Sequence, residues 1–344
     1  MYSISTSWNY WRAKSGQQIV EECIQIGLDK VELNFSLPIH LFHEIKEIVQ
    51  KGQVQVTSLH NYCPLPMTEC PDRTPDMFSL CSTNEEERNK AVEYTKKTMD
   101  AAVSVGAQAV VLHLGRVKMK DRFTPGLIAL CDRGEASGQK AQKIRDKFWR
   151  KRRHKGARCF VQALKSLDEL NDYAFATGIS LGLETRYALT EMPTLDEFEQ
   201  IFQEFRGGKL YYWHDVGHAM AKEHLGLESH DEYLRRLAPY LLGWHLHDIV
   251  GMHDHKAPAS GNFDFKRLLP YLTAQTINVL EPHHPATMEE VKKGYEFLKR
   301  EILAEGNSPL TQTGFRLSAT TTSSSTLKRV PELGRPPRRG EGIR

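Results

Sequence analysis

The sequence predicts an α/β protein that folds as a single (β/α)8 barrel. Three observations favour this fold class: short apolar, β-rich runs recur along the chain, helical segments lie between them, and a side chain of metal-ligand type closes most runs. Strands that alternate with helices are typical of a parallel sheet covered by helices. One such barrel needs about 250 residues, so the 344-residue chain is long enough to form it.

Eight segments are predicted to form the strands of the barrel. Most are continuously apolar rather than alternating, which is typical of parallel strands with helices on their outer face. In chain order the predicted strands are residues 2–6, 30–35, 54–60, 109–115, 179–184, 210–215, 241–248 and 277–281.

The segments between these runs carry helix-start signals. In a capping box, an N-cap residue such as Ser, Thr or Asn lies three positions before a Glu or Gln. Five segments begin in this way, and their boxes are Ser15–Gln18, Asn84–Glu87, Thr194–Glu197, Ser229–Glu232 and Thr287–Glu290. The repeated signal supports a regular alternation of strands and helices.

Two segments fall outside this alternation. Residues 116–158 follow the fourth strand, are basic and end in KFWRKRRHKGAR, so we expect a helical insertion over the barrel mouth. Residues 306–344 contain TTTSSST and RPPRRG, which are typical of a disordered tail. The predicted organisation is therefore a barrel over residues 1–305, including the insertion, followed by the tail.

The composition limits which classes of partner and which cellular compartment we expect. The formal net charge is +3, but Lys and Arg concentrate in residues 116–158 and 328–344, and the remaining body is acidic. A pervasive nucleic-acid surface is therefore not predicted, although nucleic acid and a second copy of the chain stay open as partners.

The six cysteines form no CxxC motif, which favours free thiols in a reducing compartment. No signal peptide and no run near the roughly 20 apolar residues that span a bilayer are present, so we expect a soluble, cytoplasmic protein.

Polar side chains at the ends of the last four predicted strands indicate a metal centre. Glu184 ends GLE, Asp215 ends YYWHD, His245 lies in GWHLHD and Glu281 ends NVLE. The active site of a (β/α)8 barrel lies at the carboxyl ends of its strands, so these side chains are expected to meet. Three carboxylates and one imidazole suit Mn, Mg, Co or Zn. Burying them together would be costly without a cation.

The ordered set of motifs resembles the xylose isomerase-like TIM barrels, a superfamily that includes sugar-phosphate isomerases and epimerases and the endonuclease IV group. The resemblance runs from about Met1 to Arg300 and omits the basic insertion. The matching segments are SLHNY, VVLHLG, GLETR, HDVGHA, HLHD followed by HDHKAPASGNFDF, and VLEPHH, of which HDVGHA is the most specific.

The resemblance to the isomerase and epimerase branch implies one metal ion bound by Glu184, Asp215, His245 and Glu281. His247 is a rival to His245, because a shift of two residues keeps the same face of the strand. Glu184 and Glu281 are then the catalytic acid–base pair, which transfers a proton through a metal-stabilised enediolate.

Further histidines are expected to bind the substrate or additional metal ions. His60, His113 and His218 line the substrate pocket in the sugar branch, and they join extra metal ions in the endonuclease IV branch. His255 matches a metal-binding histidine that follows the seventh strand in the endonuclease IV group, but His253 stands where that group has an Asp.

Three other residues are candidates for substrate contacts. Arg186 follows Glu184 closely and is expected to orient a carboxylate or phosphate, and Lys256 is expected to do the same from a loop. Glu32 ends the second predicted strand, where it could bind a substrate hydroxyl or form a salt bridge.

The leading hypothesis is a divalent-metal-dependent sugar or sugar-phosphate isomerase or epimerase, with a small sugar-like molecule as substrate. The alternative is a multi-metal phosphodiester hydrolase of the endonuclease IV type, in which the basic insertion would contact the phosphate backbone. A second alternative is a non-catalytic, metal-stabilised sugar-binding barrel. Metal stoichiometry separates the first two, since about one ion per chain favours the isomerase and two or three favour the hydrolase.

Overall fold

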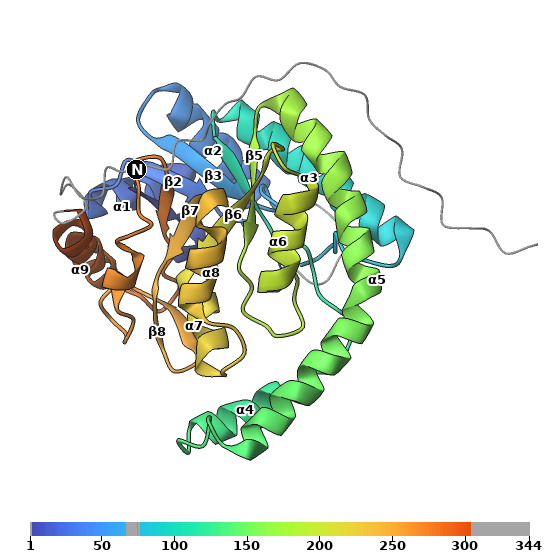
Figure 1. Ribbon diagram of the computed structural model, residues 1–344. Helices are drawn as coiled ribbons and strands as arrows, with labels where there is room; N and C mark the ends of the chain where they lie inside the picture. Colours follow the sequence, from blue (N-terminus) through green and yellow to red (C-terminus); the bar gives the residue numbers. More distant parts are fainter. Residues whose placement is uncertain (1, 67–73, 75, 304–344) are drawn as a thin grey trace, which may run out of the picture.

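The computed structural model describes residues 2–66, 74 and 76–303, and within them the chain forms a closed barrel of eight parallel strands surrounded by helices (Figure 1). Neighbouring strands follow the order β1-β10-β7-β6-β5-β4-β3-β2 around the barrel. The predicted (β/α)8 fold is confirmed. The strands are β1 (Tyr2–Ser5), β2 (Lys30–Leu33), β3 (Gln55–His60), β4 (Ala109–Leu112), β5 (Ser180–Glu184), β6 (Leu210–Asp215), β7 (Leu241–Leu246) and β10 (Ile277–Leu280).

All five predicted helix starts are present. Ser15, Asn84 and Ser229 each accept a hydrogen bond from the backbone N–H three residues on, and Thr194 and Thr287 form complete capping boxes. These bonds satisfy backbone donors that the first turn of a helix leaves unpaired. The α-helices are α1 (Gly16–Ile26), α2 (Ile39–Gln50), α3 (Glu85–Ser104), α4 (Thr124–Cys131), α5 (Gln139–Thr177), α6 (Leu195–Glu204), α7 (Val216–His224), α8 (His230–Leu237) and α9 (Met288–Leu298).

The indole of Trp213 fills the barrel interior beneath the carboxyl ends of the strands. Side chains alternate along β6, so Trp213 and Asp215 face the interior while Tyr212 packs on Phe198 of α6 outside. Glycines make room for the ring, because a Cβ at Gly243 or Gly182 would lie 2.4 Å or 2.8 Å from its atoms. The result is an apolar floor that holds the residues above it in place.

The predicted strand 241–248 is divided in the structure. The barrel strand β7 ends at Leu246, and Asp248 begins β8 (Asp248–Val250), which pairs antiparallel with β9 (His253–Lys256). This two-stranded ribbon was not predicted, because its polar sequence lacks an apolar strand pattern. Asp248 accepts hydrogen bonds from the backbone N–H groups of Ile249, Gly261 and Phe263, which fixes the turn out of the barrel.

The basic insertion forms a helical arm beside the barrel mouth. In Figure 1, α5 runs far beyond the barrel, and α4 lies along its distal end. The arm packs on Leu189, Leu225 and Met252, which lie in segments following β5, α7 and β8. Helix α5 continues for 39 residues through position 158, so the predicted edge of the insertion lies inside a helix.

Two expectations concern other parts of the chain. The predicted disordered tail, residues 306–344, lies outside the described residues. Among the helices that are described, none is long and apolar enough to cross a membrane.

Candidate metal centre

Four side chains converge above the Trp213 floor. Glu184 ends β5, Asp215 ends β6 beside His245 of β7, and Glu281 directly follows β10. Their ligand atoms all lie within 4.8 Å of one another, and all four residues are buried. The four predicted metal ligands are therefore brought together by strand register, without help from the loops.

The two carboxylate oxygens of Asp215 differ: Oδ1 is hydrogen-bonded, whereas Oδ2 has only longer contacts, with Nδ1 of His218 at 3.4 Å and Nδ1 of His245 at 3.6 Å. Its Oδ1 accepts a hydrogen bond from the backbone N–H of His218 (2.7 Å) and lies 2.9 Å from Nε2 of His247. Its Oδ2 is buried and has no hydrogen-bond partner among the described residues. A buried polar atom without a partner is costly, and an oxygen directed at two further carboxylates and an imidazole fits a cation. The donor set of this group therefore suits a divalent metal.

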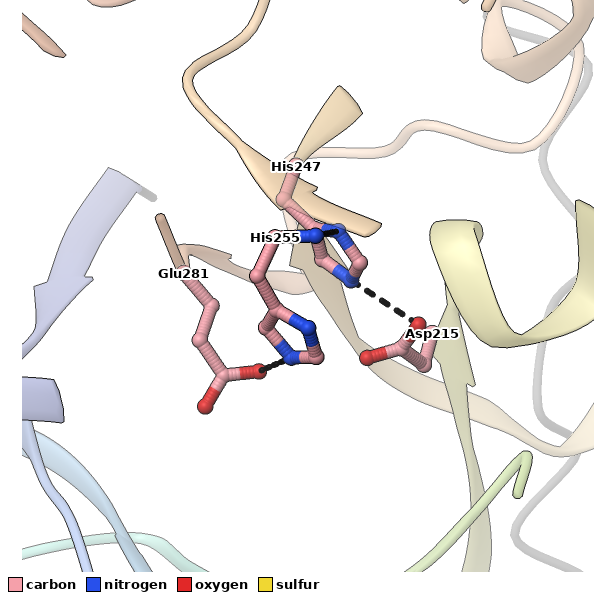
Figure 2. Close-up of side chains that lie close together, drawn as sticks. All are labelled: Asp215, His247, His255 and Glu281. Carbon is pink, nitrogen blue, oxygen red and sulfur yellow. Dashed lines mark hydrogen bonds and ion pairs between the residues drawn. The ribbon is translucent and has the colours of Figure 1, made fainter. Parts of the chain in front are cut away.

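The hydrogen bonds of the two histidines favour His245 over His247 as the ligand. Nδ1 of His247 accepts from the backbone N–H of His255 (2.8 Å), so its proton lies on Nε2 and is donated to Asp215 (Figure 2). Both nitrogens of His247 are thus occupied. Nδ1 of His245 instead lies 3.0 Å from Oε1 of Glu184 and 3.1 Å from Oε2 of Glu281. Of these two histidines, His245 is the one that directs a nitrogen between the carboxylates of Glu184 and Glu281.

Glu32 contacts the second nitrogen of the His245 imidazole. Its Oε1 lies 3.1 Å from Nε2 of His245, and its Oε2 accepts a hydrogen bond from Ser58 (2.7 Å). Of the two roles that the sequence left open for Glu32, a substrate hydroxyl or a salt bridge, the completely buried side chain shows the second, with His245 as its partner. A carboxylate that accepts from the second nitrogen of a histidine fixes its tautomer and leaves the other nitrogen free for a metal.

The charges around the metal centre shift the pKa values of His245 and Glu184. Burial lowers the pKa of His245, but the carboxylates of Glu281 and Glu32 outweigh it and raise that pKa well above the ordinary value. Burial raises the pKa of Glu184, but the charges of His113 and Arg186 outweigh it and lower the pKa well below the ordinary value. A positive charge at the centre is favourable for each of these carboxylates.

The two predicted catalytic carboxylates differ in how they are held. Oε2 of Glu184 lies 2.5 Å from Nε2 of His113 and accepts from Arg186 at 3.0 Å. Oε2 of Glu281 faces His245, whereas no hydrogen bond or ion pair within the described chain reaches its Oε1. Burial raises the pKa of both carboxyl groups, but neighbouring histidines outweigh it and hold that pKa below the ordinary value, so what distinguishes Glu281 is the oxygen without a hydrogen bond.

His60 and His113 join the same cluster on the side of Glu184. Nε2 of His60 lies 3.5 Å from Oε2 of Glu184, and the three side chains form a second group of metal-ligand type. Arg186 also occupies this side: its Nη1 contacts His113 and Glu184, and its Nη2 donates to Glu191 at 3.0 Å. The guanidinium of Arg186 therefore already contacts the atoms of His113 and Glu184 that would bind a metal ion.

His218 and His255 lie on the opposite side. They form a third group with Asp254, while His253, which stands at the expected Asp position, is exposed. His255 stacks on His247 with ring centroids 4.1 Å apart. Burial lowers the pKa of His255, but hydrogen bonds with Asp254 and Glu281 raise it to about 10.

Lys256 is the predicted site residue that the structure leaves outside these groups. Hydrogen bonds from Thr287 lower the pKa of Glu290, and the charge of Lys256 adds to that effect, which places Lys256 near the start of α9. Sequence reasoning also missed three carboxylates that the structure brings to the site: Asp76, Glu191 and Asp254. Only Asp254, between two histidines, carried a readable signal.

The comparisons with known proteins point to one superfamily. A family model described as "Xylose isomerase-like TIM barrel" matches residues 20–301. No curated protein matches the sequence of this chain.

Three solved structures share the fold at low sequence identity. A 3-keto-D-glucoside 4-epimerase from E. coli is 15% identical, with a TM-score of 0.60, over 87% of this chain and 98% of that one. A D-psicose 3-epimerase from Clostridium cellulolyticum H10 is 15% identical, with a TM-score of 0.60, over 88% of this chain and 99% of that one. A D-allulose 3-epimerase from Methylomonas sp. is 15% identical, with a TM-score of 0.61, over 87% of this chain and 96% of that one.

Proposed function

Because the chain belongs to the xylose isomerase-like TIM barrel family, we propose that it is a divalent-metal-dependent isomerase or epimerase of a sugar. The observation that carries the proposal is the unpartnered Oδ2 of Asp215, buried beside His245 and the carboxylates of Glu184 and Glu281. The similar solved structures named above are sugar epimerases, which supports the same reaction class.

Four residues of this chain would hold the metal ion: Glu184, Asp215, His245 and Glu281. When bound, a divalent ion polarises adjacent hydroxyl and carbonyl oxygens and makes the C–H beside a carbonyl more acidic. Three oxygen ligands and one nitrogen ligand suit Mn, Mg, Co or Zn.

Glu281 removes the proton and Glu184 returns it. The free Oε1 of Glu281 accepts the proton from carbon, since its other oxygen faces His245. Glu184 shares its Oε2 with His113 and so lies next to a group that can exchange a proton with it. This division of roles follows from the unequal hydrogen bonding of the two carboxylates.

His218 orients the substrate. Its Nδ1 donates to the backbone carbonyl of Thr185 at 2.9 Å, which leaves Nε2 unprotonated. Burial lowers the pKa of His218, so the ring stays neutral. Nε2 can then accept a hydrogen bond from a sugar hydroxyl.

Incorporation of deuterium from D2O at the carbon beside the carbonyl tests the reaction. We expect exchange with at least one member of a panel of ketoses and aldoses after loading with Mn2+ or Co2+. Glu281→Gln should lower the exchange rate at least about a hundredfold, because it removes the base, while Glu289→Gln on the surface of α9 should not change it. Full activity in Glu281→Gln, or no exchange with any sugar, would contradict the proposal.

A multi-metal phosphodiester hydrolase is the second candidate. It is favoured by the three additional groups of ligand type: His60 with His113 and Glu184, His218 with Asp254 and His255, and Asp215 with His247, His255 and Glu281. Arg186 argues against a metal ion in the first of these groups, because its guanidinium contacts His113 and Glu184 directly. The guanidinium and a metal ion would both be positive and would contact the same atoms, so they would repel each other strongly in this buried site.

A further inference from the structure

A second pocket lies at the rim of the barrel, between the arm and the segments that follow β3 and β4. Its volume is about 300 Å3. Cations and hydroxyls share its lining with two buried thiols, those of Cys81 and Cys159. The cationic lining residues are Arg116, Lys118, Lys155 and Arg158, the hydroxyls belong to Ser79, Ser82 and Thr83, and His154 adds an imidazole.

The cations reach the pocket from two elements by simple periodicity. Lys155 and Arg158 lie three positions apart on α5, so they occupy the same face of the helix. Arg116 and Lys118 flank the buried Val117 in the segment that follows β4, and both line the pocket. Positively charged side chains from α5 and from residues 116–118 therefore line the same pocket.

Several of these cations are not neutralised by the protein. No ion pair or hydrogen bond within the described residues involves the side chain of His154, Lys155 or Arg158. The lining holds no Asp or Glu. The nearest acids pair with the other two cations: Asp76 and Glu191 lie 2.6 Å and 3.4 Å from Nη2 of Arg116. Glu87 accepts from Ser82 at 2.7 Å and lies 3.5 Å from Lys118. Lys155 and Arg158 are therefore the lining cations without a counter-charge among the described residues, and such cations favour binding of an anion.

The pocket is connected to the metal centre through one carboxylate. Arg116 donates to Oδ2 of Asp76 at 2.6 Å, and Oδ1 of Asp76 lies 3.2 Å from Nδ1 of His113. His113 in turn contacts Glu184. An anion in the pocket would therefore lie beside the side of the site that carries Arg186 and His113.

We propose that this pocket binds a phosphate group, with Lys155, Arg158 and Arg116 as charged donors and Thr83 and Ser79 as hydroxyl donors. Guanidinium and ammonium groups form strong charge-assisted hydrogen bonds with phosphate oxygens. The proposed phosphate site is separate from the metal centre, because the packed side chains of Arg116, Asp76 and His113 lie between them.

Calorimetric titration of inorganic phosphate into chelator-treated protein tests the pocket without any turnover. The double variant Lys155→Gln with Arg158→Gln should weaken phosphate binding roughly tenfold, since it removes two charged donors. The matched control, Lys147→Gln with Arg150→Gln, removes two exposed charges from the same helix outside the pocket and should keep the affinity within about twofold. Thermal unfolding monitors that both variants remain folded.

An equal loss of phosphate affinity in both double variants, or no phosphate binding to the native protein, would contradict the proposed phosphate site. A duplex DNA oligonucleotide whose affinity falls equally in both variants would also overturn it, because that result describes a diffuse basic helix face.

Discussion

His245 is held between Glu32 on one side and the carboxylates of Glu184 and Glu281 on the other. The ring contacts Trp213 edge to face, with centroids 5.4 Å apart, so it has little freedom to turn. Because Glu32 also accepts from Ser58, its own orientation is fixed. At the scale of single residues, the site is therefore a chain of buried hydrogen bonds that directs one imidazole nitrogen towards the carboxylates of Glu184 and Glu281.

Glu32→Gln tests the role of this support. The variant keeps an acceptor for Nε2 of His245 but loses the negative charge, so we expect metal affinity to fall roughly tenfold with the fold retained. Competition with a metal-binding dye measures the affinity, and Glu47→Gln, an exposed change on α2, is the control. Unchanged affinity in Glu32→Gln would show that Glu32 does not position His245.

Glu228 connects three elements on the outside of the barrel. It accepts from the backbone N–H of Leu195 at the start of α6, from Lys222 of α7, and from Tyr233 of α8. Burial raises the pKa of Glu228, but the charge of Lys222 and these hydrogen bonds outweigh it and keep the pKa below the ordinary value of 4.5. At the scale of elements, one carboxylate fixes how the helices around β6 and β7 pack.

The sign of this pKa shift predicts a pH-dependent stability. A carboxyl group with a lowered pKa in the folded state stabilises the fold above its unfolded pKa, and that stabilisation is lost as the pH falls through the folded pKa. We expect Glu228→Gln to reduce the free energy of unfolding by roughly 2 kcal/mol at pH 7. Urea unfolding at decreasing pH should show this difference shrinking below about pH 4.5. A difference that stays constant down to pH 3 would contradict the assignment.

The fold of the whole molecule follows from patterns that are local in the sequence. Eight apolar runs and five helix caps were enough to predict the barrel, because strand and helix periodicity and capping depend on near neighbours in the chain. The four ligand positions could be predicted for the same reason: each closes a strand, and parallel strands bring their carboxyl ends together.

The rest depended on contacts between distant segments. The division of residues 241–248 into β7 and β8, and the continuation of α5 through position 158, are set by tertiary packing rather than by local pattern. The choice between His245 and His247 required the backbone N–H of His255, which the sequence does not place. Asp76 carries no signal in its own segment, because its partners His113 and Arg116 come from the next strand.

The central claim is that one divalent ion is bound by Glu184, Asp215, His245 and Glu281. Its most direct test is the metal content of the protein by mass spectrometry after chelation, reloading with Mn2+ and exhaustive dialysis. The account predicts about one ion per chain in the native protein, and its loss in Asp215→Asn and in Glu281→Gln, while Glu289→Gln keeps it. Two or three ions per chain, or full occupancy in the folded Asp215 and Glu281 variants, would contradict it.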